Sequence, residues 1–306
     1  MSSIISTRDL PQSLLSAARL VGYTPHLAST YDARVSYALY IPPSYYTNDA
    51  SLPVVVAVHG TTRQTTPLLS AFQEVADTCR CAILAPLFPA GLNGPNDWDN
   101  YRVLRPSKQD AWLGDTQADT ALLNILDTDV PARWPGLYTG KVVLAGFSGG
   151  ASMVQRFCLL YSERVIAASI AAPGSTTKLR TSQEWPEGTA DMADIFDGRA
   201  TGDLTSIAAW QLVVGSDDTA LEGSLESIVA AAQGWQERKD EVDWEQLLRS
   251  RMVSRRELLE TFADDLAKEG VKKPSVEIVP GGKHALKDVA PAMAQFLKDV
   301  IGDIAR

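Results

Sequence analysis

The stretch 141–151, Lys-Val-Val-Leu-Ala-Gly-Phe-Ser-Gly-Gly-Ala, constrains the fold of this chain more than any other feature. Its first half is a short apolar run rich in β-branched residues, which predicts a buried strand. Residues 151–161 then have the spacing of a helix. In this pattern a serine at the tip of a sharp strand-to-helix turn is exposed as a nucleophile. Because Gly146 and Gly150 lack a Cβ, we expect strand and helix to approach closely around a strained Ser148.

Strands and helices alternate along most of the chain. Residues 34–42 have period-two alternation, and the later apolar runs are continuous, which is typical of strands buried on both faces. We expect strands at 34–42, 52–58, 81–87, 141–146, 164–172, 208–214 and 276–279, and helices at 67–79, 107–127 (with Ser107 as its N-cap), 151–161 and 285–304. This alternation predicts a mostly parallel sheet with helices on both faces.

Three segments interrupt the alternation. Residues 88–106 form a long loop rich in Pro, Gly, Asn and Asp, and such loops are often functional. Residues 174–206 show no sustained period and are interpreted as an insertion. Residues 220–270 are helical and highly charged. Since α/β folds of this length commonly form one domain, we expect a single domain over residues 1–306.

Composition limits the possible partners. The 306 residues carry a net charge of −9, which argues against nucleic-acid binding because that requires a basic surface. Three scattered histidines and three cysteines offer no metal-ligand cluster, and the odd, low cysteine count does not suggest a disulfide framework, so no metal and no cofactor is expected. No window reaches the ~18 apolar residues of a membrane span. Residues 1–22 lack the apolar core of a signal peptide, so we expect a cytoplasmic protein that acts on a small molecule.

Reactive residues follow four of the predicted strands. Ligands of an open parallel sheet bind at the carboxyl ends of its strands. Here these ends carry His59-Gly60-Thr61, Ser148, Asp217-Asp218 and His284. A serine hydroxyl needs a neighbouring base, imidazole has a suitable pKa, and a carboxylate orients the imidazole and stabilises its charged form. The sequence therefore predicts a serine, histidine and aspartate acting together.

His284 is the expected base, because His26 precedes the sheet and His59 lies within a turn. The acid is Asp218 or its neighbour Asp217, and we prefer Asp218.

An oxyanion formed on attack needs preorganised N–H donors. Gly149 supplies one at the start of its helix, where backbone N–H groups lack helical partners. The turn after residues 52–58 supplies the second, most simply from Thr61. Alternatively, His59-Gly60 is only a tight turn.

These motifs together resemble the serine hydrolases of the α/β-hydrolase superfamily. The motifs are His59-Gly60-Thr61, Gly146-Phe147-Ser148-Gly149-Gly150, Gly215-Ser216-Asp217-Asp218 and Gly282-Lys283-His284. Residues 40–45, Tyr-Ile-Pro-Pro-Ser-Tyr, look most like feruloyl esterases and polyester depolymerases. The resemblance implies an eight-stranded sheet with a cap inserted after the sixth strand, which is where residues 174–206 lie.

The resemblance also implies a reaction: hydrolysis of a carboxylic ester of a small, fairly apolar molecule through an acyl-enzyme on Ser148. The same residues would serve a thioesterase, an acyltransferase or a carbon–carbon bond hydrolase, and a non-catalytic ligand-binding protein is a further alternative. Trp98, Tyr101 and Trp112 either line the substrate pocket or pack under their loop. Residues 220–270 either buttress the fold or form part of a lid.

Overall fold

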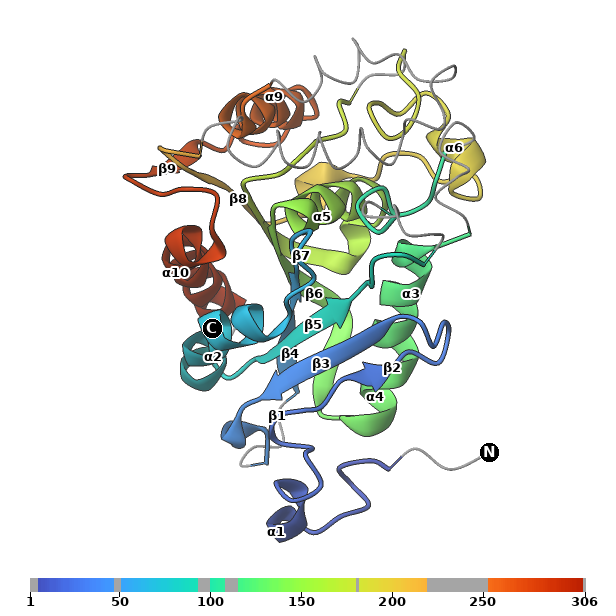
Figure 1. Cartoon of the computed structure of the whole chain (residues 1–306), viewed down its shortest axis with the longest axis vertical. Coiled ribbons are helices and arrows are strands. Elements are labelled where there is room, and N and C mark those ends of the chain that lie inside the picture. Colours follow the sequence, from blue (N-terminus) through green and yellow to red (C-terminus); the bar gives the residue numbers. More distant parts are fainter. Residues whose placement is uncertain are drawn as a thin grey trace.

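A nine-stranded, mostly parallel sheet forms the centre of the protein (Figure 1). The computed structural model describes residues 5–46, 51–92, 100–107, 115–179, 182–218 and 253–304. The strands are β1 (Gly22–Tyr23), β2 (Leu27–Ala28), β3 (Ser36–Ile41), β4 (Leu52–Val58), β5 (Ala82–Leu87), β6 (Leu137–Phe147), β7 (Val165–Ala171), β8 (Ala209–Gly215) and β9 (Val276–Val279). Their order is β1-β3-β5-β4-β6-β7-β8-β9, with β2 also on β3. The pairs of β3 are antiparallel and the others are parallel.

The apolar runs form strands because both faces of the sheet are covered. Along β4, Val54 and Val56 pack into one hydrophobic cluster, whereas Val55 and Ala57 pack into the other. Fully burying each such valine contributes about 1.5–3 kcal/mol. The predicted strands all form, and the mostly parallel α/β fold is confirmed.

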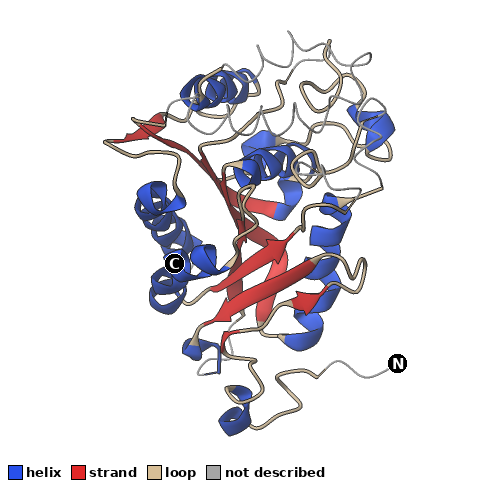
Figure 2. Ribbon diagram, viewed as in Figure 1, coloured by secondary structure: helices blue, strands red, loops and turns tan. Residues whose placement is uncertain are grey.

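Helices cover both faces (Figure 2). α2 (Thr66–Cys79) and α10 (Leu286–Ile304) pack on one face and α5 (Gly149–Leu160) on the other. The other helical segments among the described residues are α1 (Gln12–Leu15), η1 (Pro43–Tyr46), α3 (Ala118–Asn124), η3 (Ile125–Asp129), α4 (Val130–Arg133), η4 (Ser162–Arg164), α6 (Met192–Ile195), η5 (Leu204–Ser206) and α9 (Arg255–Lys268). α9 lies on the α5 side, since its buried side chains join the same cluster.

The helix predicted over 107–127 is interrupted where the structure describes it. Residues 115–117 are not helical, and α3 starts at Ala118. The Ala118 N–H donates to the carbonyl oxygen of Leu104 (2.9 Å) rather than to a preceding helical turn. Residues 108–114 lie outside the described residues, so the first part of the predicted helix and its N-cap Ser107 stay predictions.

The described parts of the 174–206 segment, residues 174–179 and 182–206, follow β7 and pack against α5 and the 100–107 segment. Arg156 of α5 donates to Thr177 Oγ1 (2.9 Å), and Trp185 Nε1 donates to the Val103 carbonyl oxygen (2.8 Å). Trp185 and Phe196 are buried and their rings meet edge to face. The segment is therefore fixed to the body of the protein by its own buried residues.

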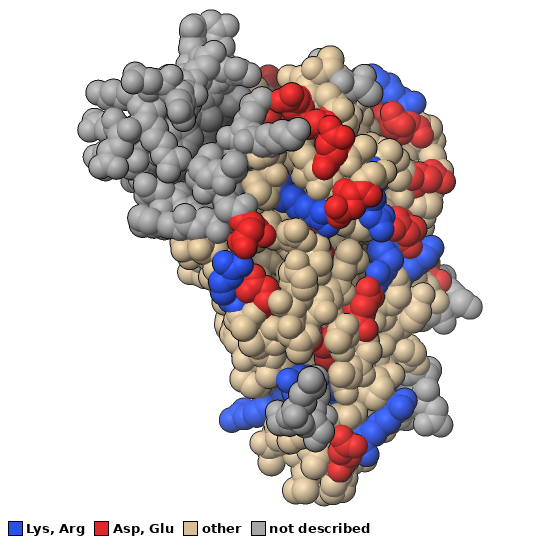
Figure 3. Space-filling model, turned by 90° about the vertical axis from the view of Figure 1, so that its right-hand side faces the viewer, with Lys and Arg blue, Asp and Glu red and all other residues tan. Residues whose placement is uncertain are grey.

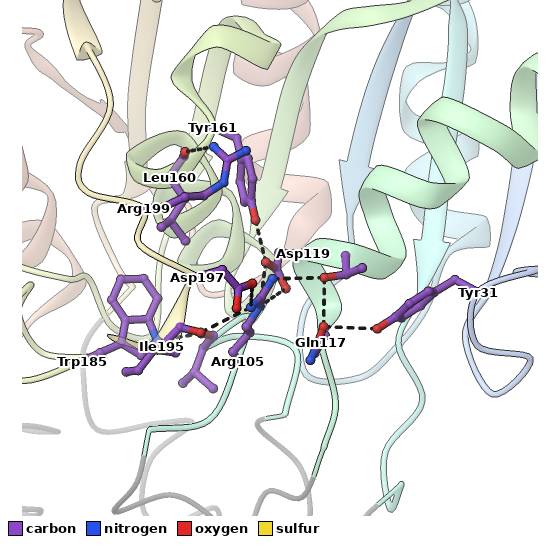
Figure 4. Close-up of polar contacts among 12 residues, drawn as sticks. Tyr31, Arg105, Gln117, Asp119, Leu160, Tyr161, Trp185, Ile195, Asp197 and Arg199 are labelled. Atoms are coloured by element: carbon purple, nitrogen blue, oxygen red, sulfur yellow. Dashed lines mark hydrogen bonds and ion pairs between the residues drawn. The ribbon is translucent and has the colours of Figure 1, made fainter. Parts of the chain in front are cut away.

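A buried polar network strengthens this attachment (Figure 4). Asp119 of α3 is fully buried and accepts hydrogen bonds from Arg105 Nε (3.0 and 3.1 Å) and from the Tyr161 hydroxyl (2.7 Å). Arg105 also donates to Asp197 (2.7 Å) and to the Ile195 carbonyl oxygen (3.3 Å). Burial, with the neighbouring Asp119 carboxylate, raises the pKa of Tyr161 well above its usual value. The network joins α3, the end of α5 and residues 195–197.

Replacing Asp119 with asparagine is expected to lower the free energy of unfolding by about 3 kcal/mol, because it leaves the largely buried Arg105 without its buried counter-charge. Asp197→Asn is the matched control. Asp197 bonds the same guanidinium but its side chain is 82% exposed, so its loss should cost less than about 1 kcal/mol. Urea unfolding of both variants measures the difference. Equal losses would contradict the assignment of Asp119 as the structural anchor.

Charged side chains on the surface are mixed in sign. Figure 3 shows Lys and Arg interspersed with Asp and Glu across one face. Exposed pairs such as Arg199–Glu163 (3.3 Å) are each worth at most about 1 kcal/mol. Within the described ranges, no helix combines the length and apolar character needed to cross a bilayer.

Candidate active site

Ser148 lies at the junction of β6 and α5 with φ +55° and ψ −118°, a conformation that non-glycine residues rarely adopt. At the two flanking glycines, Gly146 and Gly150, neighbouring backbone atoms leave no room for a side chain. A Cβ at Gly146 would collide with the carbonyl oxygen of Gly150, and a Cβ at Gly150 would collide with that of Val58. The two glycines therefore permit the close strand–helix approach that the sequence predicts.

The structure brings Ser148, His284 and Asp218 together. Ser148 Oγ lies 2.9 Å from His284 Nε2, and His284 Nδ1 lies 2.9 Å from Asp218 Oδ2. Because Nδ1 faces a carboxylate, it carries the hydrogen, and Nε2 is left to accept the serine proton. The Asp218 side chain is fully buried, the His284 side chain is 27% exposed, and Phe147 stacks on the imidazole with ring centroids 5.0 Å apart.

Two loop contacts select Asp218 over Asp217. The Asp217 N–H donates to the Gly282 carbonyl oxygen (2.9 Å), and its exposed carboxylate accepts from Ser216 Oγ (2.8 Å). Gly215 packs so closely on Gly282 that a Cβ at Gly215 would collide with the Gly282 carbonyl oxygen. This contact sets the β8 and β9 loops side by side and leaves Asp218 facing His284.

Gly149 and Thr61, the expected oxyanion donors, are neighbours. Gly149 is the first residue of α5. A Cβ on it would lie 3.3 Å from Thr61 Oγ1 and 2.9 Å from Arg102 Cδ, and it would collide with the Tyr101 hydroxyl. The first N–H groups of a helix lack helical acceptors, so this end of α5 is suited to stabilising negative charge beside Ser148.

Arg63 and Tyr101 hold the turn at residues 59–61 through hydrogen bonds to its carbonyl oxygens. Arg63 donates to the carbonyl oxygens of Thr61 (2.9 Å) and Phe88 (2.8 Å), and its guanidinium lies over the Tyr101 ring at 4.6 Å. The Tyr101 hydroxyl donates to the His59 carbonyl oxygen (3.1 Å). Tyr101 is completely buried and packs against the rings of His59 and Phe88. Its role in lining a substrate pocket stays a prediction.

His59 is held as a neutral imidazole. Its Nδ1 lies 2.9 Å from the Gly60 carbonyl oxygen and therefore donates, whereas Nε2 accepts from the Phe88 N–H (3.0 Å). Burial lowers the pKa of His59 to about 4. The imidazole is thus a structural part of the turn, fixed in one tautomer.

This histidine is expected to make stability fall in mild acid. The unfolded chain binds a proton near pH 6.5 and the folded chain only near pH 4, so stability is lost as pH falls from about 6.5 to 4. Protonation of His59 in the unfolded chain should lower the free energy of unfolding by about 2 kcal/mol between pH 7 and pH 5. Urea unfolding of wild type and His59→Asn at both pH values measures it, with His26→Asn as the control for loss of an exposed histidine. An unchanged pH dependence in His59→Asn would contradict the prediction.

Trp98 and Trp112, proposed with Tyr101 to line a pocket, lie outside the described residues. A separate cavity of about 740 Å³ lies at the amino-terminal ends of β8 and β9, whereas Ser148 lies at the carboxyl end of β6. It is lined by the starts of β8 and β9 and by α10, including Trp210, Gln211 and Phe296, and does not include Ser148. No group of three or more potential metal ligands occurs among the residues that the structure describes.

Sequence reasoning missed Arg255, which contacts Asp218 on the carboxylate oxygen not used by His284 (2.6 Å). A local signal for its helix does exist. Ser254 and Glu257 form a capping box that marks the start of α9. The pairing with Asp218 has no such signal, because the two residues are far apart in the chain.

Comparison with known proteins identifies the fold. No family model and no curated protein sequence matches the chain. Among solved structures, poly(aspartic acid) hydrolase-1 from Sphingomonas sp. KT-1 is similar, with a TM-score of 0.60 at 15% identity, covering 86% of this chain and 93% of that one. The LpqC poly(3-hydroxybutyrate) depolymerase from Bordetella parapertussis has a TM-score of 0.58 at 22% identity (97% and 95% covered). An S-formylglutathione hydrolase from Agrobacterium tumefaciens has a TM-score of 0.56 at 15% identity (88% and 89% covered). The strand order and these similarities show that the chain has the α/β-hydrolase fold.

Proposed function

We propose that the protein is a serine hydrolase that cleaves a carboxylic ester of a small, fairly apolar molecule through an acyl-enzyme. The observation that carries the proposal is the continuous series of contacts from Ser148 Oγ through His284 to the buried Asp218 carboxylate. The series begins at Ser148, whose backbone is strained and which directly precedes a helix. This is the geometry expected of an activated nucleophile.

In the proposed first step, Ser148 Oγ attacks the ester carbonyl carbon while His284 Nε2 takes its proton. The imidazolium formed is stabilised by Asp218. The developing oxyanion lies at the start of α5, within reach of N–H groups of Gly149 and Thr61. Collapse of the tetrahedral intermediate breaks the ester C–O bond, and His284 returns its proton to the leaving alkoxide.

The second step reverses these roles. Water attacks the acyl carbon, His284 accepts a proton from the water, and Ser148 Oγ leaves with that proton as the acid is released. Each step uses the same two hydrogen bonds of His284, which is why both of its ring nitrogens need fixed partners.

The names of the structural neighbours support hydrolysis, because each is called a hydrolase or a depolymerase. The bond cleaved is the part of the proposal that needs its own test. A panel of p-nitrophenyl esters and matched acyl thioesters, followed in the first turnover, separates the reactions. We expect the esters to show a burst of p-nitrophenol and steady turnover. Preference for thioesters or for acyl transfer to an added alcohol would reassign the reaction, and binding without turnover would make the protein a ligand-binding member of the fold.

A further inference from the structure

The buried carboxylate of Asp218 has a second charged partner besides His284. Arg255 Nη1 donates to Asp218 Oδ1 at 2.6 Å, whereas His284 Nδ1 contacts Oδ2 at 2.9 Å. The Asp218 side chain is fully buried, and that of Arg255 is 13% exposed. The two oxygens of one carboxylate are therefore divided between an imidazole and a guanidinium.

Arg255 is held in place by the helix that carries it. It is the first residue of α9, directly after the N-cap Ser254, whose hydroxyl accepts from the Glu257 N–H (3.2 Å). Leu259 and Phe262 of the same helix are buried in the core on the α5 side of the sheet. The guanidinium thus projects from a fixed point on a helix anchored to the sheet.

The position of Arg255 has an energetic cost. Its Nε is buried and has no hydrogen-bond partner among the described residues. An unsatisfied buried donor destabilises the folded state, because its hydration is lost without a replacement hydrogen bond. The contact with Asp218 is the interaction that offsets this cost, so the pair, and not the surroundings of the arginine alone, explains why a guanidinium lies here.

We propose that Arg255 is a positioning residue: it holds Oδ1 so that Oδ2 stays on His284, and its charge offsets part of the carboxylate's attraction for a protonated imidazole. This inference rests on the proposed function of Ser148 and His284. It assigns Arg255 no contact with the substrate, since Arg255 acts through Asp218.

Other charged groups near the pair are exposed or bonded elsewhere, within the part of the chain that the structure describes. Asp217 is exposed and accepts from Ser216, and Lys283 is exposed. Asp288, at the start of α10, accepts from the Lys283 N–H (2.9 Å). Arg256 points to Glu260 and is 62% exposed. Arg255 is therefore the charged group expected to influence the Asp218–His284 pair most.

Removing the guanidinium has two expected effects. The carboxylate becomes free to rotate, which weakens its bond to His284 and lowers kcat. Its full negative charge also favours the imidazolium, so His284 is protonated at a higher pH and the acid-side fall of kcat/KM moves upward. One charged neighbour of this kind is worth on the order of one pH unit.

The test compares Arg255→Met and Arg255→Lys with Arg256→Met, which removes the adjacent, exposed arginine of the same helix. We expect Arg255→Met to lower kcat about 10-fold to 100-fold and to raise the acid-side midpoint of kcat/KM by about 0.5–1 pH unit. Arg255→Lys keeps the positive charge, so its acid-side midpoint of kcat/KM should lie close to that of wild type. Arg256→Met should change neither. If Arg255→Met is folded and less active but keeps the acid-side midpoint of wild type, Arg255 has only a structural role and the proposal is overturned.

An activity-independent measurement separates this inference from the proposed function. The protonation of His284 can be followed by NMR of the labelled imidazole in wild type, Arg255→Met and Arg255→Lys. An upward shift in Arg255→Met that is reversed in Arg255→Lys supports the inference even for a protein that turns over no ester. The same titration curve in all three proteins contradicts it, whatever the activity.

Discussion

Ser148→Ala is expected to lower ester turnover by at least about 10⁴-fold while leaving the fold intact. The hydroxyl is the proposed nucleophile, and it lies 2.9 Å from His284 Nε2, the proposed base. Among the described residues the serine side chain has one hydrogen bond, to His284, and it is only half-buried, so its loss removes little stabilising contact.

The measurement is kcat/KM on the best p-nitrophenyl ester, together with the melting temperature. Ser206→Ala, at an exposed position in η5 before β8, serves as the matched serine control and should keep full activity. Retention of full esterase activity in Ser148→Ala would show that the proposed nucleophile is wrong.

The second large effect is expected at Asp218. Asparagine there can donate to His284 through its amide, which favours the tautomer with the hydrogen on Nε2 and removes the acceptor that Ser148 needs. A loss of about 10³-fold to 10⁴-fold in kcat is typical of this change. The substitution also leaves Arg255 without its buried counter-charge, so some loss of stability is expected as well.

Asp217→Asn is the matched control, one residue away and of the same chemistry. Because the Asp217 carboxylate is exposed and, among the described residues, bonds only Ser216, we expect kcat to change less than about 3-fold. Kinetics of the two variants side by side decide between the neighbours. The reverse ranking would make Asp217 the acid and would contradict the geometry of the β8 loop.

The sequence was sufficient for the sheet because its signals are local and strong. β4 and β9 begin and end where the apolar runs at 52–58 and 276–279 do, each being closed by polar or glycine-rich turns. Parallel strands place their carboxyl ends at one edge, so Ser148, Asp218 and His284 could be predicted to meet although they are distant in the chain.

Other features depend on contacts that no local pattern encodes. The start of α3 is set by a bond from Ala118 to Leu104, which the helical spacing of 107–127 does not reveal. The sequence suits Tyr101 equally to a pocket and to packing, and it does not reveal the burial of this residue or its bond to the His59 carbonyl oxygen. The bond from Arg255 to Asp218 joins two separate elements, and a charged helical segment gives no sign of which arginine faces inward.

The extended region 220–270 is described only from residue 253 onward. Its described part, α9, packs its apolar side chains into the core, which favours the buttress interpretation for that helix. The cap role of residues 174–206 and the single-domain organisation stay predictions, as does the cytoplasmic location.

Labelling with a fluorophosphonate probe tests the central claim most directly, because the probe reacts with an activated serine whatever the natural substrate is. After labelling at neutral pH, peptide mass spectrometry locates the adduct. We predict one stoichiometric adduct on Ser148, its loss in Ser148→Ala, and much slower labelling in His284→Ala, where the base is missing. A folded wild-type protein that stays unlabelled, or that is labelled at another residue, would contradict the claim that Ser148, His284 and Asp218 form the catalytic site.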